Sequence, residues 1–163
     1  MSSPSESSEP ASPRIASFAA FWPYYISEHR VPMSRWLHFI GTTGFLLIFA
    51  ACVAMNPLHM ALAAAPAAAA LFAGFRLEAR RSSAPLLLLG IGCFALASPW
   101  VLLGVVWAYA FAWIGHFRIE LNRPATFQYP LWSLAGDFRM VSWMWTGRLW
   151  SGNAHHIAPL AEP

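Results

Sequence analysis

Two long stretches of this chain carry no charged side chain. Residues 37–75 contain no Asp, Glu, Lys or Arg, and neither do residues 82–117. A helix needs about 20 apolar residues to cross a bilayer, so each stretch has room for two crossings. The pattern predicts an all-α integral membrane protein built on a four-helix bundle.

Proline-containing breaks divide the two stretches into shorter segments. Asn56-Pro57 interrupts the first and Ser98-Pro99 the second, because proline lacks the amide hydrogen that a continuing helix donates. The predicted spans are 36–55, 58–75, 84–97 and 100–117. The third is short, so it is compatible with a thin span, a re-entrant segment or the first half of one kinked helix.

The composition agrees with a membrane setting. Hydrophobic residues make up 58% of the 163 residues, charged residues 10%, and the mean hydropathy is +0.48, well outside the range usual for soluble proteins. All ten basic residues are arginines that form no long basic run, so we expect no nucleic-acid partner. The two cysteines lie in the apolar stretches, where cysteine is usually a small buried hydrophobic residue.

The arginines predict the orientation of the bundle. They precede the first predicted span, follow the second and follow the fourth, whereas the breaks at 56–57 and 98–99 have none. Positive residues favour the cytoplasmic side, so both termini and the 76–83 loop are predicted to be cytoplasmic, in a bacterial inner membrane or an endoplasmic reticulum. Four spans also place His38 and His116 at the same membrane face, whereas three would separate them.

Composition further divides the chain into three parts. The Ser- and Pro-rich residues 1–17 predict a disordered tail, residues 18–150 a single membrane domain, and residues 151–163 a flexible tail. After the last span, tryptophans are spaced among arginines, which is typical of an amphipathic segment lying in the membrane interface. The Ala-rich second segment is expected to serve close helix packing alone.

Three histidines and one carboxylate are predicted to meet at one membrane face. His29 and His38 lie around the start of the first span. His116 and Glu120 end the last span, four residues apart and therefore on one helical face. Imidazoles with a carboxylate suit Fe(II), Zn(II) or Mn(II), although a histidine at a helix end is more often a hydrogen-bonded interfacial residue. The spacing leaves both interpretations open.

The remaining polar residues near the membrane are expected to have ordinary roles. His59 opens the second span at the opposite face and is predicted to be interfacial. Asp137 is expected to pair with Arg139 or Arg123 rather than to bind a metal. His155 and His156 lie in the predicted C-terminal tail, which leaves open whether either joins the site.

Two motifs carry a resemblance to a known family. One is FWPYYISEHRVPMSRWLHFIGTT and the other is AWIGHFRIELNRPATFQYPLWSLAGDF. In this order they resemble the signatures of the 2-hydroxy fatty acid (2-hydroxypalmitate) dioxygenase family of small membrane proteins, over residues 18 to about 140. The lysine that often follows the motif glutamate is Leu121 here, which affects no proposed ligand.

The resemblance implies an Fe(II)-dependent dioxygenase of fatty-acid α-oxidation. Such an enzyme consumes O2 and removes the carboxyl carbon of a 2-hydroxy fatty acid, leaving a fatty acid one carbon shorter. The motif histidines are His29, His38 and His116, and Glu120 is the motif acid, acting either as a metal ligand or by orienting a histidine. A 2-hydroxy acid offers its carboxylate and hydroxyl to one metal ion, so no further cosubstrate is required.

Substrate contacts are expected beside these ligands. Arg123 could pair with the substrate carboxylate, since arginine forms a bidentate fork with planar anions, or it could anchor a lipid headgroup. Tyr25 and Asn122, which also lie in the two motifs, are the other candidate substrate-binding residues. The acyl chain would lie between helices, with the small residues 41–44 forming a wall where it could enter.

Two other functional classes stay open at this point. A haem-binding electron carrier would use His38 and His116 as axial ligands and would leave His29 and Glu120 without a role. A membrane scaffold or lipid-binding protein would have interfacial histidines and no stoichiometric metal. The preferred chain length and the oligomeric state are not predicted.

Overall fold

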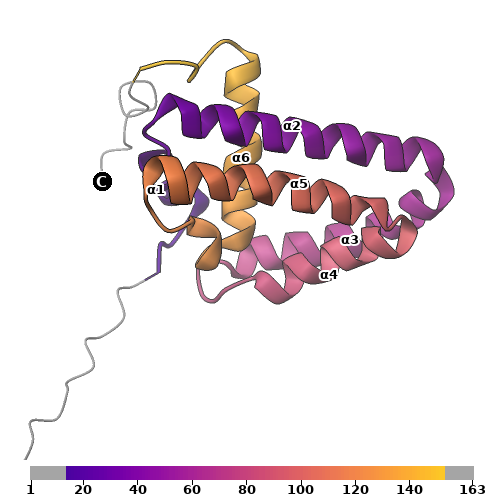
Figure 1. The fold of residues 1–163 in the computed structure, drawn as a ribbon. Coiled ribbons are helices and arrows are strands. Elements are labelled where there is room, and N and C mark those ends of the chain that lie inside the picture. Colours follow the sequence, from indigo (N-terminus) through magenta and orange to yellow (C-terminus); the bar gives the residue numbers. More distant parts are fainter. Residues whose placement is uncertain (1–13, 153–163) are drawn as a thin grey trace, which may run out of the picture.

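The computed structural model describes residues 14–152, and all regular elements in that range are helices (Figure 1). The all-α prediction is therefore confirmed for this range. The elements are α1 (Phe18–Ser27), α2 (Pro32–Met55), α3 (Pro57–Leu77), α4 (Ala84–Ala97), α5 (Trp100–Ile114), the π-helix η1 (Gly115–Glu120), the 3-10 helix η2 (Ala125–Phe127) and α6 (Pro130–Trp145).

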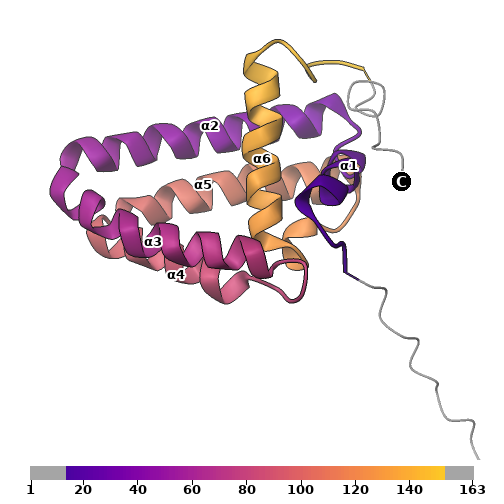
Figure 2. The same cartoon turned by 180° about the vertical axis from the view of Figure 1, so that it is seen from behind.

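Prolines begin most of the long helices. Pro32, Pro57 and Pro130 are the first residues of α2, α3 and α6, where the missing amide hydrogen costs nothing and the fixed φ angle suits a helix. Pro57 and Pro99 also separate α3 from α2 and α5 from α4 by a single turn. The four helices α2, α3, α4 and α5 consequently run back and forth along one direction (Figures 1 and 2).

Three of these helices are long and apolar enough to cross a membrane. They are Pro32–Met55, Pro57–Leu77 and the combined segment Trp100–Glu120. Helix α4 has 14 residues, about 21 Å at the usual helical rise, which is short for a crossing. Three of the predicted spans thus coincide with helices that could cross a membrane, and a fourth span at Ala84–Ala97 stays a prediction. Because α4 returns the chain alongside α3, the start of α2 and the end of α5 lie at the same end of the molecule (Figure 1).

Small residues let the helices approach closely. The buried face of α3 packs against α4 and consists of Met60, Ala63, Ala67, Ala70 and Gly74, so the predicted packing role of the Ala-rich segment is confirmed. Helix α2 approaches α5 in the same way. A Cβ on Gly41 would lie 3.1 Å from the Ala108 carbonyl oxygen, and one on Gly44 would lie 2.1 Å from the Trp107 ring.

This packing corrects one expectation. Gly41 and Gly44 fill the contact between α2 and α5 rather than forming a wall where an acyl chain enters. Of the segment 41–44, Thr42 lines the cavity that begins at the histidines. The small residues at this point allow the backbones to meet, and a channel there would separate them.

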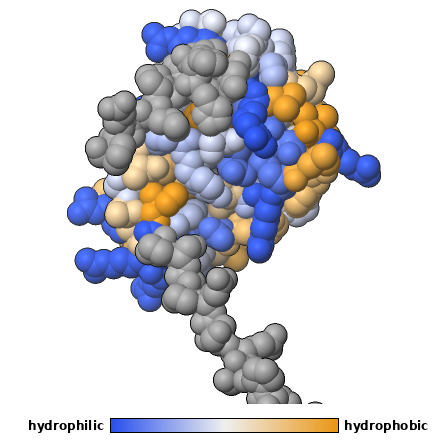
Figure 3. All heavy atoms as spheres, turned by 90° about the vertical axis from the view of Figure 1, so that its left-hand side faces the viewer, coloured by the Kyte–Doolittle hydropathy of each residue, from blue (hydrophilic) through white to orange (hydrophobic). Residues whose placement is uncertain are grey.

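Helix α6 runs across the other helices instead of alongside them (Figure 2). One face is buried against α1, α2, α3 and α4, and includes Trp132, Ser133, Gly136, Met140 and Met144. The opposite side exposes Trp145. This is the amphipathic character predicted for the segment, and its place in a membrane interface stays a prediction. Figure 3 shows the end of the molecule where α6 and α1 meet the bundle, here called the polar end, where many hydrophilic residues lie at the surface among hydrophobic ones.

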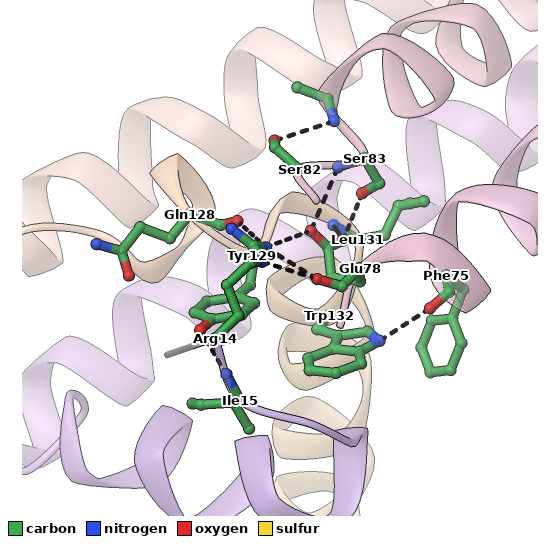
Figure 4. A network of polar contacts seen from close by, with 11 residues as sticks. Arg14, Ile15, Phe75, Glu78, Ser82, Ser83, Gln128, Tyr129, Leu131 and Trp132 are labelled. Carbon is green, nitrogen blue, oxygen red and sulfur yellow. Dashed lines mark hydrogen bonds and ion pairs between the residues drawn. The ribbon is translucent and has the colours of Figure 1, made fainter. Parts of the chain in front are cut away.

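A buried carboxylate joins three segments at this polar end. Glu78 is fully buried, and its carboxylate accepts hydrogen bonds from the Ser83 hydroxyl and, at 2.8 Å, from the Leu131 amide (Figure 4). Arg14 donates to the Glu78 carbonyl oxygen at 2.9 Å and lies 3.6 Å from its carboxylate. Residues 14–17 therefore belong to the folded domain and not to the predicted tail; residues 1–13 lie outside the described range.

A buried arginine holds the C-terminal segment. The Arg35 guanidinium is fully buried and donates to the carbonyl oxygens of Leu149 and Gly152, each at 2.8 Å. It also donates to the carbonyl oxygens of His29 at 2.9 Å and Arg30 at 2.7 Å. One side chain thus ties the α1–α2 loop to the first residues of the predicted C-terminal tail. Residues 153–163, including His155 and His156, lie outside the described range.

Replacing Glu78 tests this account of the polar end. Glu78→Ala leaves buried donors without an acceptor and should lower the free energy of unfolding by about 3 kcal/mol. Glu78→Gln, which retains one acceptor oxygen, should lose less. Thermal unfolding in detergent measures both, with Arg80→Ala, an exposed residue of the same turn, as the control. An unfolding temperature for Glu78→Ala equal to that of the control would contradict the account.

Candidate metal centre

Three buried histidines converge at the polar end of the bundle. His29 lies in the loop after α1, His38 in the second turn of α2, and His116 in η1. Their exposed fractions are 0%, 3% and 4%. One ring nitrogen from each histidine lies within 4.8 Å of the corresponding atoms of the other two. The structure therefore brings together the three histidines that the motifs single out.

Each imidazole has a hydrogen-bond acceptor on its Nδ1 side. The acceptors are the Tyr25 carbonyl oxygen for His29 at 2.7 Å, the Asp137 carboxylate for His38 at 2.8 Å, and the Asn122 side-chain oxygen for His116 at 2.7 Å. An acceptor at Nδ1 requires the proton to be on that nitrogen. A neutral imidazole with its proton on Nδ1 offers Nε2 as a lone-pair donor, which is the form that binds a metal.

Two of the ring nitrogens lie as close together as ligands of one ion. Nε2 of His29 and Nε2 of His38 are 3.1 Å apart, and two unprotonated nitrogens at this distance repel each other unless a proton or cation lies between them. Nitrogen ligands about 2.1 Å from one ion are about 3.0–3.4 Å from each other, depending on the coordination geometry. Burial and then the neighbouring His38 and His116 hold the pKa of His29 well below its usual value. His29 is therefore neutral, as a ligand must be, and the donor set fits a divalent metal ion.

Asp137 anchors one side of the cluster. Its carboxylate accepts hydrogen bonds from His38 Nδ1 and from the Tyr25 hydroxyl. Burial, followed by this carboxylate, raises the pKa of Tyr25 well above its usual value, so the tyrosine keeps its proton and donates it. The prediction that Asp137 pairs with Arg139 or Arg123 is wrong.

The error has a geometric cause. Residues two apart on a helix face nearly opposite directions. Asp137 faces α2 while the Arg139 guanidinium lies 4.3 Å from the ring centroid of Trp22. The signal that could have found Asp137 is its place in the second motif. Gly136 beside it allows α6 to approach Tyr25 closely, because a Cβ there would lie 2.7 Å from the Tyr25 ring.

The π-helix positions His116. Over Gly115–Glu120 the backbone hydrogen bonds span five residues instead of four, and the helix ends at Leu121 in the left-handed conformation with φ 55°. This turn brings the Asn122 amide to within 3.1 Å of the His116 carbonyl oxygen, so the Asn122 side chain can accept the proton of His116 Nδ1. Asn122 also donates to Glu28 at 2.8 Å. It therefore contacts a histidine of the cluster, and its substrate-binding role stays a prediction.

Glu120 holds the loop that carries His29. Its carboxylate accepts a hydrogen bond from the Val31 amide at 2.8 Å and is outside the three-histidine group. The spacing argument for a shared face with His116 assumed an α-helix, whereas this segment is a π-helix. Glu120 as a metal ligand stays a prediction.

Two other polar residues lie away from the cluster. Arg123 is exposed, with its guanidinium 5.0 Å from the ring centroid of Phe127, so its contact with a substrate carboxylate stays a prediction. His59 is exposed in the first turn of α3, at the end of the bundle opposite the cluster, as predicted.

A cavity, here called the proximal cavity, begins at the three histidines. Tyr25 and Asp137 line it beside them, and the walls then follow α2, α4, α5 and α6 through residues such as Thr42, Phe45, Ala112, Ser133 and Leu134. Most of the lining is apolar. Ser133 is buried and, within the described residues, its hydroxyl has no hydrogen-bond partner. The cavity therefore offers an apolar volume with a few polar groups at the histidine end, as small-molecule sites usually do.

Comparison with known proteins agrees with this site. Residues 15–149 match the family described as 2-hydroxy-palmitic acid dioxygenase Mpo1-like. The chain belongs to this family. The match covers both motifs, all three histidines of the cluster and the acceptors of their Nδ1 protons. No curated protein and no solved structure matches the chain.

The arrangement disfavours a haem between His38 and His116. Their ring centroids are 5.2 Å apart, and His29 lies 4.5 Å and 4.8 Å from them. Three imidazoles in mutual contact leave no slot for a macrocycle between two of them. The haem hypothesis also gave His29 no role, whereas the structure makes it the most buried member of the cluster.

Removal of single histidines tests the metal site. His38→Ala or His116→Ala should abolish stoichiometric metal binding, because each removes one of three converging Nε2 donors. His59→Ala, at the other end of the bundle, should bind metal as the wild type does. Mass spectrometric metal analysis after anaerobic Fe(II) reloading provides the measurement. Equal loss from all three variants would indicate misfolding or a site elsewhere.

The hydrogen bond from His38 to Asp137 gives a graded prediction. Asp137→Asn keeps the shape but removes the charge that fixes the His38 proton on Nδ1, and should weaken metal affinity by about 10–100-fold. Competition with a chelator measures the affinity. Arg139→Gln, on the same helix but stacked on Trp22, is the matched control, and an unchanged affinity in Asp137→Asn would show that the carboxylate does not support the site.

Proposed function

We propose that this protein is an Fe(II)-dependent dioxygenase that converts 2-hydroxy fatty acids to fatty acids one carbon shorter. Membership of the family described as a 2-hydroxy-palmitic acid dioxygenase supports the reaction. The single observation that carries the proposal is the convergence of three buried imidazoles, with each Nδ1 proton taken by an acceptor. Buried histidines arranged in this way are costly unless they bind a cation.

The proposed reaction balances without a further cosubstrate. R–CH(OH)–COOH and O2 give R–COOH, CO2 and H2O, so the bond between the carboxyl carbon and carbon 2 breaks and carbon 2 becomes the new carboxyl carbon. The substrate loses four electrons, which is the number that one O2 accepts. A bound ferrous ion supplies the redox and Lewis-acid chemistry that reaction with O2 requires.

The protein side chains position the reactants. Asp137 and Asn122 keep the protons of His38 and His116 on Nδ1, and Tyr25 donates its proton to the same Asp137. The Ser133 hydroxyl, buried without a partner among the described residues, is suited to a hydrogen bond with the polar head of the substrate. The apolar walls of the proximal cavity exclude water from the reacting atoms.

The membrane setting suits this substrate. Three helices are long and apolar enough to cross a bilayer, and the polar end that holds the histidines (Figure 3) would lie at the interface. A fatty acid in a bilayer also keeps its carboxylate at the interface and its chain in the apolar region. Under the positive-inside rule this face is cytoplasmic, with both termini on the same side.

Turnover of 2-hydroxypalmitate is the direct test. Detergent-purified protein reloaded with Fe(II) should consume one O2 for each pentadecanoate formed, as measured with an oxygen electrode and mass spectrometry of the product. His38→Ala should abolish both signals and His59→Ala should retain them. Iron binding without O2 uptake would retain the metal site but refute this substrate, and failure to bind iron would refute the mechanism.

A further inference from the structure

A second cavity lies further along the same helices. This distal cavity is bounded by α2, α3, α4, α5 and α6, and its lining residues are all apolar. Phe49 and Phe94 meet edge to face there, with ring centroids 5.0 Å apart, and Val101 lies beside them. These three residues mark the part of the cavity furthest from the histidines.

The two cavities share one wall. Six residues line both of them, namely Phe45, Leu87, Ile91, Val105, Leu134 and Phe138. A single layer of flexible apolar side chains therefore borders both spaces, with the polar groups of Tyr25, His38 and Asp137 at one end and only apolar groups at the other. This polarity matches that of a fatty acid, which has a polar head and a long apolar chain.

The helices give the length of this path. His38, Phe45 and Phe49 lie on one side of α2, and Phe45 and Phe49 follow His38 by seven and eleven positions. At about 1.5 Å per residue these positions are about 10 Å and 16 Å from the histidine. An extended carbon chain advances about 1.25 Å per bond, given C–C bonds of about 1.5 Å at about 111°. The proximal cavity therefore takes about 8 carbons and the two cavities together about 13 beyond the head group.

We propose that the two cavities form one channel for the acyl chain, and that Val105 and Val101 of α5 border this channel at two depths that set how long a chain it accepts. The proposal rests on the proposed function for the identity of the head group. Val105, in the shared wall, limits the chain to about ten carbons in total if the channel is blocked there. Val101 lies one turn further along α5, about 5–6 Å, at the end of the open channel, so a larger side chain there should shorten the accepted chain to below about fifteen carbons.

Substituted valines on α5 provide a matched test. Val105→Phe should block the channel at the shared wall, and Val101→Phe should fill the distal cavity. Val106→Phe is the control, because it makes the same change on the same helix at a residue that is 65% exposed and lines neither cavity. Phe94→Ala, which enlarges the distal end, provides a variant with the opposite effect.

Binding is measured with Fe(II)-loaded protein in nanodiscs under argon, where O2 is absent and no turnover occurs. Competition against radiolabelled 2-hydroxypalmitate gives the affinity for 2-hydroxyoctanoate, 2-hydroxydecanoate, 2-hydroxytetradecanoate and 2-hydroxypalmitate. In the wild type and in Val106→Phe, each added methylene should increase the affinity about fourfold. The gain should stop beyond 2-hydroxydecanoate in Val105→Phe and beyond 2-hydroxytetradecanoate in Val101→Phe.

The outcomes separate the channel from the reaction. Wild-type chain-length dependence in both blocking variants, with their iron content unchanged, would overturn the channel. If either blocking variant fails to hold iron, Phe94→Ala decides, because the channel predicts a larger affinity gain from 2-hydroxypalmitate to 2-hydroxystearate than in the wild type. Binding with the predicted dependence but no O2 uptake in air would support the channel and refute the dioxygenase. O2 uptake with an unaltered chain-length profile in every variant would support the dioxygenase and overturn the channel.

Discussion

Three imidazole nitrogens that face one another in a buried space are the constraint on which the rest of this structure depends. Each Nδ1 proton is held by an acceptor from a different segment: Tyr25 in α1, Asp137 in α6 and Asn122 after η1. The lone pairs are therefore forced inward, and only a cation compensates for them at low cost. The arrangement requires elements that are far apart in the sequence to end at one place. Four helices that run back and forth meet this requirement, because they return the chain to its starting end.

Two of the segments that carry the histidines have dedicated anchors. The Arg35 guanidinium binds the carbonyl oxygen of His29, and the Glu120 carboxylate binds the amide of Val31 in the same loop. The left-handed residue Leu121 ends the π-helix so that Asn122 reaches His116. These anchors use buried charges and one strained backbone conformation, both of which cost stability. Such costs in stability are usual at functional sites, where side chains are held in positions that the chemistry requires.

The sequence predicts some of these features and not others, for physical reasons. Uncharged stretches and the prolines at 57 and 99 predict the long helices because span length and proline geometry are local properties. The motif histidines predict the cluster, since the helix order alone brings their ends together. The partner of Asp137 was predicted wrongly because it depends on the rotation of α6, which tertiary packing sets. The π-helix was not predicted either. It changes how His116 and Glu120 lie relative to each other, because the spacing argument assumed an α-helix. Arg123, favoured for its charge, lies over Phe127, while Ser133 faces the cavity.

The central claim is that the three histidines bind one ferrous ion, and X-ray absorption spectroscopy of the iron-loaded protein under argon tests it most directly. The account predicts a ferrous absorption edge and a first shell of nitrogen and oxygen at about 2.1 Å, with the outer-shell scattering of several imidazoles. His38→Ala should hold too little iron to give this spectrum. A spectrum without imidazole scattering, or the wild-type spectrum from His38→Ala at full iron occupancy, would contradict the claim.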